Sequence, residues 1–142
     1  MAVSPIPDEH HLVRHVKKRS LATDPDDPSV VLGFLGDAFR LKAGEDSLSA
    51  SWAEFFAGHS DQVRAAIDHF KTVYTVKKAD RFAVGQVGAI KGACATFGIN
   101  ARIVKEPMPG YASHAAVRRY RDENLELLEA LASDAWAGMA TP

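Results

Sequence analysis

The sequence predicts an α+β fold: a single-domain sandwich in which helices pack against a small mixed or antiparallel sheet. Residues 60–74 and 124–136 place apolar side chains at helical spacing, whereas residues 81–88 alternate in the manner of a strand. The connections between such segments are uneven in length, which disfavours a doubly wound parallel sheet. The 142 residues fit one domain, which we place at residues 10–142 after a flexible N-terminal tail at residues 1–9.

The first third of the chain favours short strands and loops. Residues 10–16 suit a strand, and the polar stretch at residues 17–28 ends in two prolines among three aspartates, so it is expected to be a solvated loop. Residues 29–35 favour a short strand or an irregular buried segment. Residues 38–42 alternate apolar and polar side chains and predict a further strand.

Two helices are expected next. Ser49 fits the N-cap of a short helix that ends at Gly58, and Ser60 fits the N-cap of a longer one. The longer helix has one apolar side, which consists of Val63, Ala66, Ile67, Phe70, Val73 and Tyr74.

The remaining elements alternate between strands and helices. Residues 81–88 and 99–104 favour strands on either side of a short helix at residues 89–97, and two prolines mark a loop at residues 106–110. Ser113 fits the N-cap of a helical region whose clearest part begins near residue 124. The core face of that region is Leu125, Leu128, Leu131, Ala132, Ala135 and Trp136.

Composition excludes several classes of protein. The formal charge of −1 gives no overall attraction to nucleic acid or to an anionic membrane, although a local patch stays possible. Cys94 is the only cysteine, so neither an intramolecular disulfide nor a cysteine-based zinc site can form; we expect it to be buried. Without a signal-like or membrane-length apolar segment, we expect a cytoplasmic protein that needs no cofactor.

Two histidines near the N-terminus could carry chemistry. In a strand over residues 10–16, His11 and His15 share one face and Arg14 lies on the other. Paired imidazoles could bind a metal or act as acid and base. His11 and His15 have helical zinc spacing, but Leu12 stands where a metalloprotease needs glutamate, so we assign no metal site. The same residues also fit a partly exposed strand with no chemical role.

Ser113 and His114 form the second candidate. They follow the proline-rich loop and open the predicted helical region, where backbone N–H groups attract anions and the helix dipole disfavours a charged imidazole. A neutral histidine there could handle phosphate or act as a general base. An ordinary serine cap followed by an exposed histidine is the alternative.

Basic residues are concentrated in three short stretches, which are residues 14–19, 77–81 and 118–121. If these stretches converged, they could bind phosphates, but otherwise each is a solvated face. The glycines at residues 85–92 do not match a nucleotide-binding loop, so we interpret them as sites of close packing or of a β-bulge.

Three short motifs carry a resemblance. Leu48-Ser49-Ala50-Ser51-Trp52, the segment at residues 82–88 and Ser113-His114-Ala115 are similar to elements of small uncharacterised bacterial proteins, which pair Leu-Ser-x-x-Trp with Ser-His-Ala. The likeness covers roughly residues 10–120. It implies a bacterial origin and a mobile-element or conflict-system setting, and it implies no reaction.

Two functional hypotheses follow. In the first, the protein binds or acts on a phosphate-bearing ligand, RNA or a nucleotide: Arg14 holds phosphate, His15 or His114 moves a proton, and Ser49 and Ser113 contact the ligand. In the second, the protein is a non-enzymatic interaction module or a subunit of an oligomer. Its apolar face would consist of Trp52, Phe55, Phe56 and Trp136.

Overall fold

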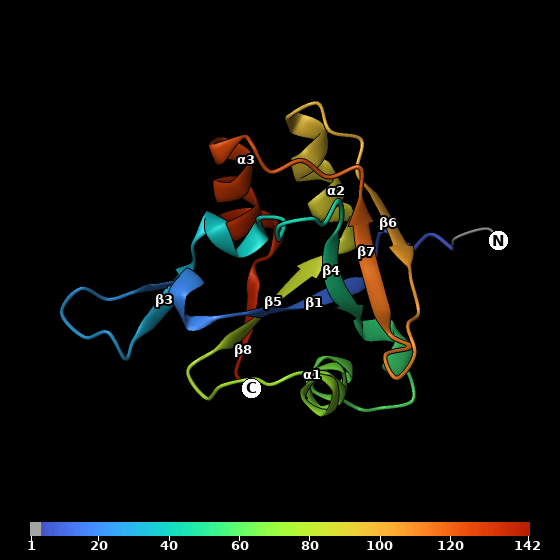
Figure 1. Cartoon of the computed structure of the whole chain (residues 1–142), viewed down its shortest axis with the longest axis horizontal. Coiled ribbons are helices and arrows are strands. Elements are labelled where there is room, and N and C mark those ends of the chain that lie inside the picture. Colours follow the sequence, from blue (N-terminus) through green and yellow to red (C-terminus); the bar gives the residue numbers. More distant parts are fainter. Residues whose placement is uncertain (1–3) are drawn as a thin grey trace.

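A computed structural model describes residues 4–142 and has the α+β fold that the sequence predicts. Its centre is a six-stranded sheet in the order β6-β7-β4-β1-β5-β8, in which all neighbouring strands are antiparallel (Figure 1). A separate two-stranded sheet, β2-β3, projects from it. The strands are β1 His11–Val16, β2 Leu21–Thr23, β3 Val31–Phe34, β4 Leu48–Trp52, β5 Arg81–Gln86, β6 Arg102–Lys105, β7 His114–Arg118 and β8 Gly138–Ala140.

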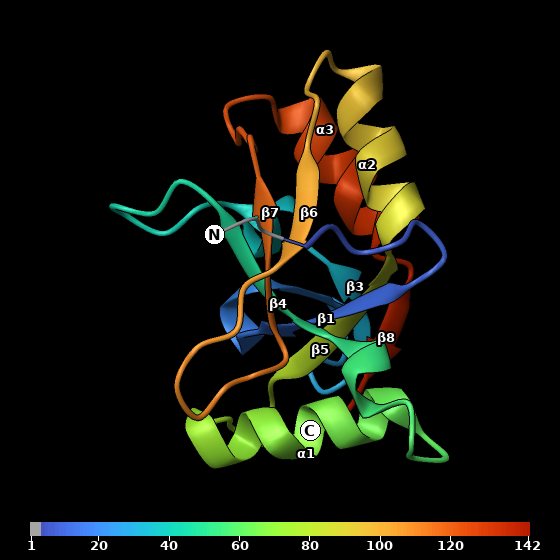
Figure 2. The same cartoon turned by 90° about the vertical axis from the view of Figure 1, so that its right-hand side faces the viewer.

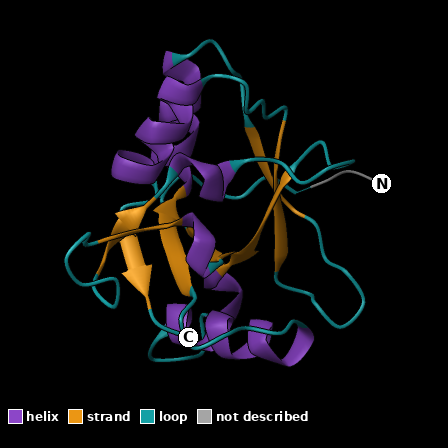
Figure 3. Cartoon of the chain, turned by 60° about the vertical axis from the view of Figure 1, so that its left-hand side comes forward, coloured by secondary structure: helices purple, strands orange, loops and turns teal. Residues whose placement is uncertain are grey.

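Helices cover opposite faces of the sheet. Helix α1 (Gln62–Val73) lies on one face, and α2 (Val87–Thr96) and α3 (Leu125–Ala130) lie together on the other (Figures 1 and 3). A π-helical turn at Leu131–Ala135 continues α3. Short 3₁₀ segments occupy Lys18–Ser20, Gly36–Phe39 and Ala53–Phe56.

The alternation of β1 explains why both faces are covered. Leu12 and Val16 point into the larger core beneath α2 and α3, while Val13 points into a smaller core beneath α1. At the larger core, a Cβ added to Gly85 would lie 3.0 Å from ring carbons of the buried Trp136. This confirms the interpretation of Gly85 as a site of close packing.

The segment before β1 lies along the sheet. The Ile6 N–H donates to the Ile103 carbonyl, the Lys105 N–H donates to the Ser4 carbonyl, and the Ile6 side chain is buried. Of the flexible tail that the sequence predicts at residues 1–9, residues 4–6 are therefore docked beside β6, and Asp8 contacts the start of α2 through the Gly88 N–H and Lys91. Residues 1–3 of that segment lie outside the described residues.

Four other predictions are wrong. Residues 17–28 were expected to be a solvated loop, but they include a 3₁₀ turn and strand β2, whose Leu21 is buried in the core. Residues 38–42 were expected to form a strand, but they hold the end of a 3₁₀ turn and a loop, because the segment packs on α3 rather than pairing with a strand. The helix expected between Ser49 and Gly58 is strand β4 followed by a 3₁₀ turn, since β4 pairs on both sides. The helical region expected from Ser113 begins with strand β7, and only its second half is helical.

A divergence between two central strands positions the site. Strand β1 pairs with β5 over its whole length, but with β4 only at Leu12↔Trp52 and Val13↔Ser51. Beyond Val13 the two strands therefore separate, and side chains rather than backbone hydrogen bonds fill the gap.

Candidate functional site

A cavity of about 740 Å³ opens where β1 and β4 separate. Its walls come from β1, the segment between the 3₁₀ turn and β4, the C-terminal end of α1, and the loop between β6 and β7, which reaches down to α1 (Figure 2). Four of the five residues that the sequence singled out line this cavity: Arg14, His15, Ser49 and His114. Ser113 does not line it, and its buried hydroxyl has no hydrogen-bond partner among residues 4–142.

Arg14 fills the gap between the two strands. Its Nε donates to the Ala38 carbonyl at 2.9 Å and its Nη1 donates to the Ser49 carbonyl at 2.7 Å. Within residues 4–142, no carboxylate lies within 4.0 Å of the guanidinium, and Nη2 donates no hydrogen bond. Burial lowers the pKa of Arg14 to about 10, so the group stays positively charged at neutral pH at a cost in stability.

His15 is held by a buried carboxylate. Its Nε2 lies 2.8 Å from Oδ2 of Asp80, and its ring packs between Phe70 and Phe82. Asp80 also accepts hydrogen bonds from the Lys77 and Lys18 amides. Because an ionised carboxylate only accepts, the hydrogen must lie on Nε2, which leaves Nδ1 as the nitrogen that can exchange a proton.

The pKa of Asp80 reflects two opposing effects. Burial alone would raise it, but the hydrogen bonds from the Lys77 amide, the His15 ring and the Lys18 amide outweigh burial, and the pKa is lowered below its usual 3.8. Asp80 is therefore an anion at neutral pH, and its charge faces the His15 ring.

The His114 ring is held through its other ring nitrogen, Nδ1. Its Nδ1 lies 2.9 Å from the Glu106 carbonyl oxygen and 3.5 Å from a carboxylate oxygen of the same residue, whose carboxylate also pairs with Arg118. A carbonyl accepts and cannot donate, so Nδ1 carries the hydrogen. In the neutral ring, Nε2 then has the free lone pair, and His114 lines the cavity.

An aromatic wall stands beside these groups. Phe70 and Tyr74 come from the end of α1, and Tyr111 comes from the β6–β7 loop; their ring centroids lie 4.8–6.0 Å apart. Tyr74 is 45% exposed, whereas Tyr111 is buried, and burial raises the pKa of Tyr111 to about 12. Tyr111 is therefore neutral and can donate or accept a hydrogen bond.

Charges of both signs surround the mouth of the cavity. The basic residues are Lys17, Arg19, Arg40 and Lys42, and the acidic ones are Asp37, Glu45, Asp46 and Glu106. Arg40 and Asp37 neutralise each other through a 2.7 Å ion pair, and Glu106 pairs with Arg118, which does not line the cavity. Lys17, Arg19, Lys42 and Arg14 are then left against Glu45 and Asp46, so the unpaired charges of the cavity are cationic on balance.

The other predicted groups lie elsewhere. His11 shares a face of β1 with His15, but its Nδ1 contacts Glu54 at 2.8 Å. Of the three basic stretches, residues 14–19 contribute to the lining of the cavity, whereas residues 77–81 and 118–121 do not. The three stretches therefore do not converge on this cavity. The anion site expected from a helix N-terminus at His114 is wrong, since His114 begins a strand.

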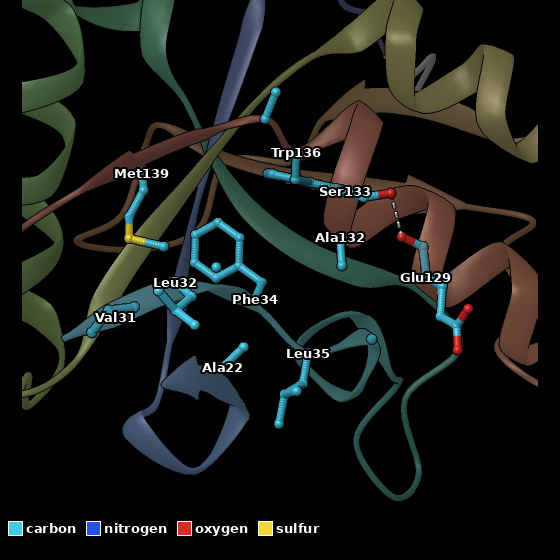
Figure 4. A pocket seen from close by; sticks show the side chains of 13 residues that line it. Ala22, Val31, Leu32, Phe34, Leu35, Glu129, Ala132, Ser133, Trp136 and Met139 are labelled. Atoms are coloured by element: carbon cyan, nitrogen blue, oxygen red, sulfur yellow. Dashed lines mark hydrogen bonds between the residues drawn. The ribbon is translucent and has the colours of Figure 1, made fainter. Parts of the chain in front are cut away.

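A second hollow of about 640 Å³ lies between the β2–β3 hairpin and the end of α3 (Figure 4). It is mostly apolar, and Leu32, Leu35 and Met139 on its walls are 64%, 43% and 39% exposed. The apolar face expected from the sequence is different. Of its members, Trp136 is fully buried, Trp52 is half-buried against His10 and Phe56 is half-buried, which leaves Phe55 as the one exposed side chain of the four.

Sequence reasoning missed Asp80 and Tyr111. The signal for Asp80 is positional: β5 runs antiparallel to β1 with Arg81 opposite Val16, which brings the start of β5 to the end of β1 that carries His15. Nothing local marks Tyr111, because its role depends on a loop reaching a helix forty residues earlier in the chain.

Among residues 4–142, no three histidine, cysteine, aspartate or glutamate residues are grouped so that they could hold a metal ion. None of the helices described is long and apolar enough to cross a membrane. No protein-family model, curated protein or solved structure matches the chain.

Proposed function

We propose that the cavity between β1 and β4 binds a phosphate-bearing ligand, RNA or a nucleotide, and that the protein acts on it. The observation that carries this proposal is Arg14: a half-buried, desolvated guanidinium with no carboxylate of residues 4–142 within 4.0 Å and with Nη2 making no hydrogen bond, in a cavity that also holds two oriented imidazoles. Burying an unpaired charge costs free energy, and an anionic ligand would supply the missing partner.

The neighbouring groups suit a nucleotide rather than a small inorganic anion. The aromatic wall of Phe70, Tyr74 and Tyr111 offers apolar surface next to the cationic centre, which matches the chemistry of a base joined to a phosphate. The Ser49 hydroxyl, which has no hydrogen-bond partner among residues 4–142, could orient the ligand.

Binding of adenosine 3′-monophosphate, with adenosine as the uncharged comparison, tests this proposal by calorimetry. The expected result is that the nucleotide binds, that the nucleoside binds at least tenfold more weakly, and that Arg14→Met removes the difference. A hydrogen bond between charged groups is worth about 1.5–3 kcal/mol, which corresponds to roughly 10–100-fold in affinity.

Arg40→Met is the matched control, because Arg40 lines the same cavity but is already paired with Asp37. Equal affinity for nucleotide and nucleoside, or an Arg40→Met effect as large as that of Arg14→Met, would remove the proposal. The first result would show that phosphate is not recognised, and the second that only overall charge matters.

A second candidate function, self-association, is favoured by the apolar hollow beside the hairpin. Leu32 and Met139 are exposed on its walls, and β8, which carries Met139, is an edge strand of the main sheet (Figure 4). Edge strands and apolar patches both promote pairing between copies of a chain. Light scattering at several concentrations tests it: a monomer at all of them rejects this function, and a dimer lost in Leu32→Glu supports it.

The bacterial conflict-system setting implied by the Leu-Ser-x-x-Trp and Ser-His-Ala elements is compatible with an activity on RNA, and we include it in the proposal on that ground alone. The two elements lie on adjacent strands, since Ser51 of β4 pairs with His114 of β7. Cytoplasmic localisation is part of the same proposal.

A further inference from the structure

We propose that the two imidazoles that line the cavity, His114 with its free Nε2 and His15 with its free Nδ1, cleave single-stranded RNA by transferring protons on either side of a phosphodiester held at Arg14. This inference rests on the proposed function, because it assigns a substrate and a reaction to the same cavity. It adds that the ribose 2′-hydroxyl is the nucleophile.

The first argument is that the two rings share one face of the sheet. Val13 pairs with Ser51, and Ser51 pairs with His114, so these three residues form a row across β1, β4 and β7. His15 lies two residues beyond Val13 and thus on the same face. Arg14 alternates onto the opposite face, but it lies in the gap between β1 and β4, where it donates to the Ser49 carbonyl and lines the same cavity. Strands about 4.8 Å apart with a rise of about 3.4 Å per residue would place the Cα atoms of His15 and His114 roughly 12 Å apart, and the divergence of β1 from β4 adds to this, which leaves room for a phosphodiester between the rings.

The second argument is that the surroundings give the rings different roles. When the His114 ring is neutral, it presents a lone pair at Nε2, because its Nδ1 hydrogen is held by the Glu106 carbonyl, so it suits a general base. The Glu106 carboxylate also lies 3.5 Å from this Nδ1, but it is paired with Arg118. His15 lies 2.8 Å from the buried Asp80 carboxylate, which pairs with no lysine or arginine side chain among residues 4–142 and would stabilise the positive charge of a protonated His15 ring. His15 therefore suits a general acid that donates from Nδ1.

The third argument is that the mouth of the cavity can follow a chain. Tyr74 is partly exposed at one side, and Lys17, Arg19 and Lys42 are exposed around the rim. An exposed ring can stack on a base, and the lysines and arginine can contact phosphates on either side of the one at Arg14. A single strand can place its bases in this way, whereas a duplex keeps them paired.

The reaction is redox-neutral and balanced. Nε2 of His114 accepts the proton of the 2′-hydroxyl as the bond from O2′ to phosphorus forms. The bond from phosphorus to O5′ breaks, and O5′ receives the proton from Nδ1 of His15. Arg14 stabilises the additional negative charge on the phosphoryl oxygens during the step. The products are a 2′,3′-cyclic phosphate and a 5′-hydroxyl, and proton exchange with water restores the two rings.

The test is incubation of the purified chain with a fluorescent single-stranded RNA decamer of mixed sequence in EDTA, followed by mass spectrometry of the products. The same decamer with 2′-O-methyl riboses lacks the nucleophile and serves to measure binding by anisotropy. The variants are His114→Ala, His15→Ala and the control His59→Ala, which removes an exposed histidine outside the cavity. Each variant is melted to confirm that it folds.

The expected result is cleavage of the RNA to cyclic phosphate and 5′-hydroxyl ends, with the methylated decamer bound but intact. His114→Ala and His15→Ala should each lower the rate by about 100-fold or more, and His59→Ala should leave it unchanged. If His114→Ala does not fold, His15→Ala and the methylated decamer still decide the outcome.

Three results would overturn the inference. One is cleavage of the methylated decamer, another is products with 5′-phosphate ends, and the third is Arg14-dependent binding of RNA without cleavage. Binding of RNA without cleavage would overturn only this inference and would leave the proposed function in place. Absence of binding to both the decamer and adenosine 3′-monophosphate would remove the proposed function as well.

Discussion

Replacement of Asp80 by asparagine should destabilise the protein although the two side chains have nearly the same shape. Asp80 is 3% exposed and accepts three hydrogen bonds: from the His15 ring and the Lys77 amide at Oδ2, and from the Lys18 amide at Oδ1. Asparagine can offer only one oxygen. We expect that oxygen to take the place of Oδ2, where it retains two donors, so that the amide nitrogen faces the Lys18 N–H.

The magnitude follows from those contacts. One hydrogen bond to a charged acceptor is lost, at about 1.5–3 kcal/mol, and two others become roughly half as strong because the acceptor is neutral. The lower cost of burying an amide offsets part of this loss. We expect Asp80→Asn to reduce the free energy of unfolding by about 2–3 kcal/mol, which for a chain of this length lowers Tm by roughly 8 °C.

Urea denaturation between pH 3 and pH 7 measures the effect and its pH dependence. The pKa of Asp80 in the folded protein lies below its ordinary value of 3.8, so its ionised form stabilises the fold above about pH 4. That contribution is lost as the pH falls through the lowered pKa, and the wild type and Asp80→Asn should converge there.

Asp68→Asn is the control, because Asp68 is exposed and pairs only with Arg64 on the surface of α1. Its loss should cost no more than about 0.5 kcal/mol. The reasoning fails if Asp80→Asn is as stable as Asp68→Asn at pH 7, or if its deficit stays constant down to pH 3.

Three further variants or reagents test the packing. Gly85→Ala should destabilise the protein by about 1–3 kcal/mol, because the new methyl group meets Trp136 at 3.0 Å, whereas Gly92→Ala meets no atom within 4 Å and should stabilise α2 slightly; both are measured by urea denaturation. Burial raises the pKa of Cys94 to about 11, so a thiol reagent at pH 8 should react only in denaturant, and rapid reaction with the native protein would contradict its burial. Tyr120→Phe should cost about 1–2 kcal/mol, since the Tyr120 hydroxyl donates to a buried backbone carbonyl at 2.6 Å, and an unchanged melting curve would contradict this.

The sequence predicts the elements whose periodicity reports burial directly. Helix α1 has one apolar side that packs on a core, and β5 buries Phe82 on one face of the sheet and Ala83 on the other, so both segments are recognisable as apolar without the fold. The α+β class follows from such segments. Helix α3 is also found, although its N-cap is Asn124 rather than Ser113 and Leu125, expected on its core face, is 60% exposed.

The failed predictions share a physical cause. Ser49, which lies in β4, and Ser113, which precedes β7, fit helix caps locally, but both segments are central strands that pair on two sides, and tertiary pairing overrides local preference. Residues 38–42 alternate like a strand in sequence, but Ala38 and Phe39 are the buried end of the 3₁₀ turn, and Arg40 is exposed in the loop that follows it.

The site was predicted in part because its residues are unusual for their positions. Arg14 follows Leu12 and Val13 in a largely apolar strand, and His114 lies in a run of small residues, so both stand out in the sequence. Their convergence could not be predicted, since it depends on β4 lying between β1 and β7. Asp80 and Tyr111 lie in ordinary polar or loop sequence and become significant only through contacts with distant segments.

Arg14 links the architecture of the sheet to the proposed activity. If β1 and β4 continued to pair beyond Val13, backbone N–H groups would satisfy the Ser49 carbonyl and no cavity would form. A leucine at position 14 would then complete the core at no electrostatic cost. The chain instead has a guanidinium that lies between the strands, donates to the Ala38 and Ser49 carbonyls, and has no carboxylate of the described residues within 4.0 Å, while Nη2 makes no hydrogen bond. A side chain that only bridged β1 and β4 would need neither a charge nor a third nitrogen. A structural role therefore does not explain the charge and the unused nitrogen of Arg14, whereas an anionic ligand does.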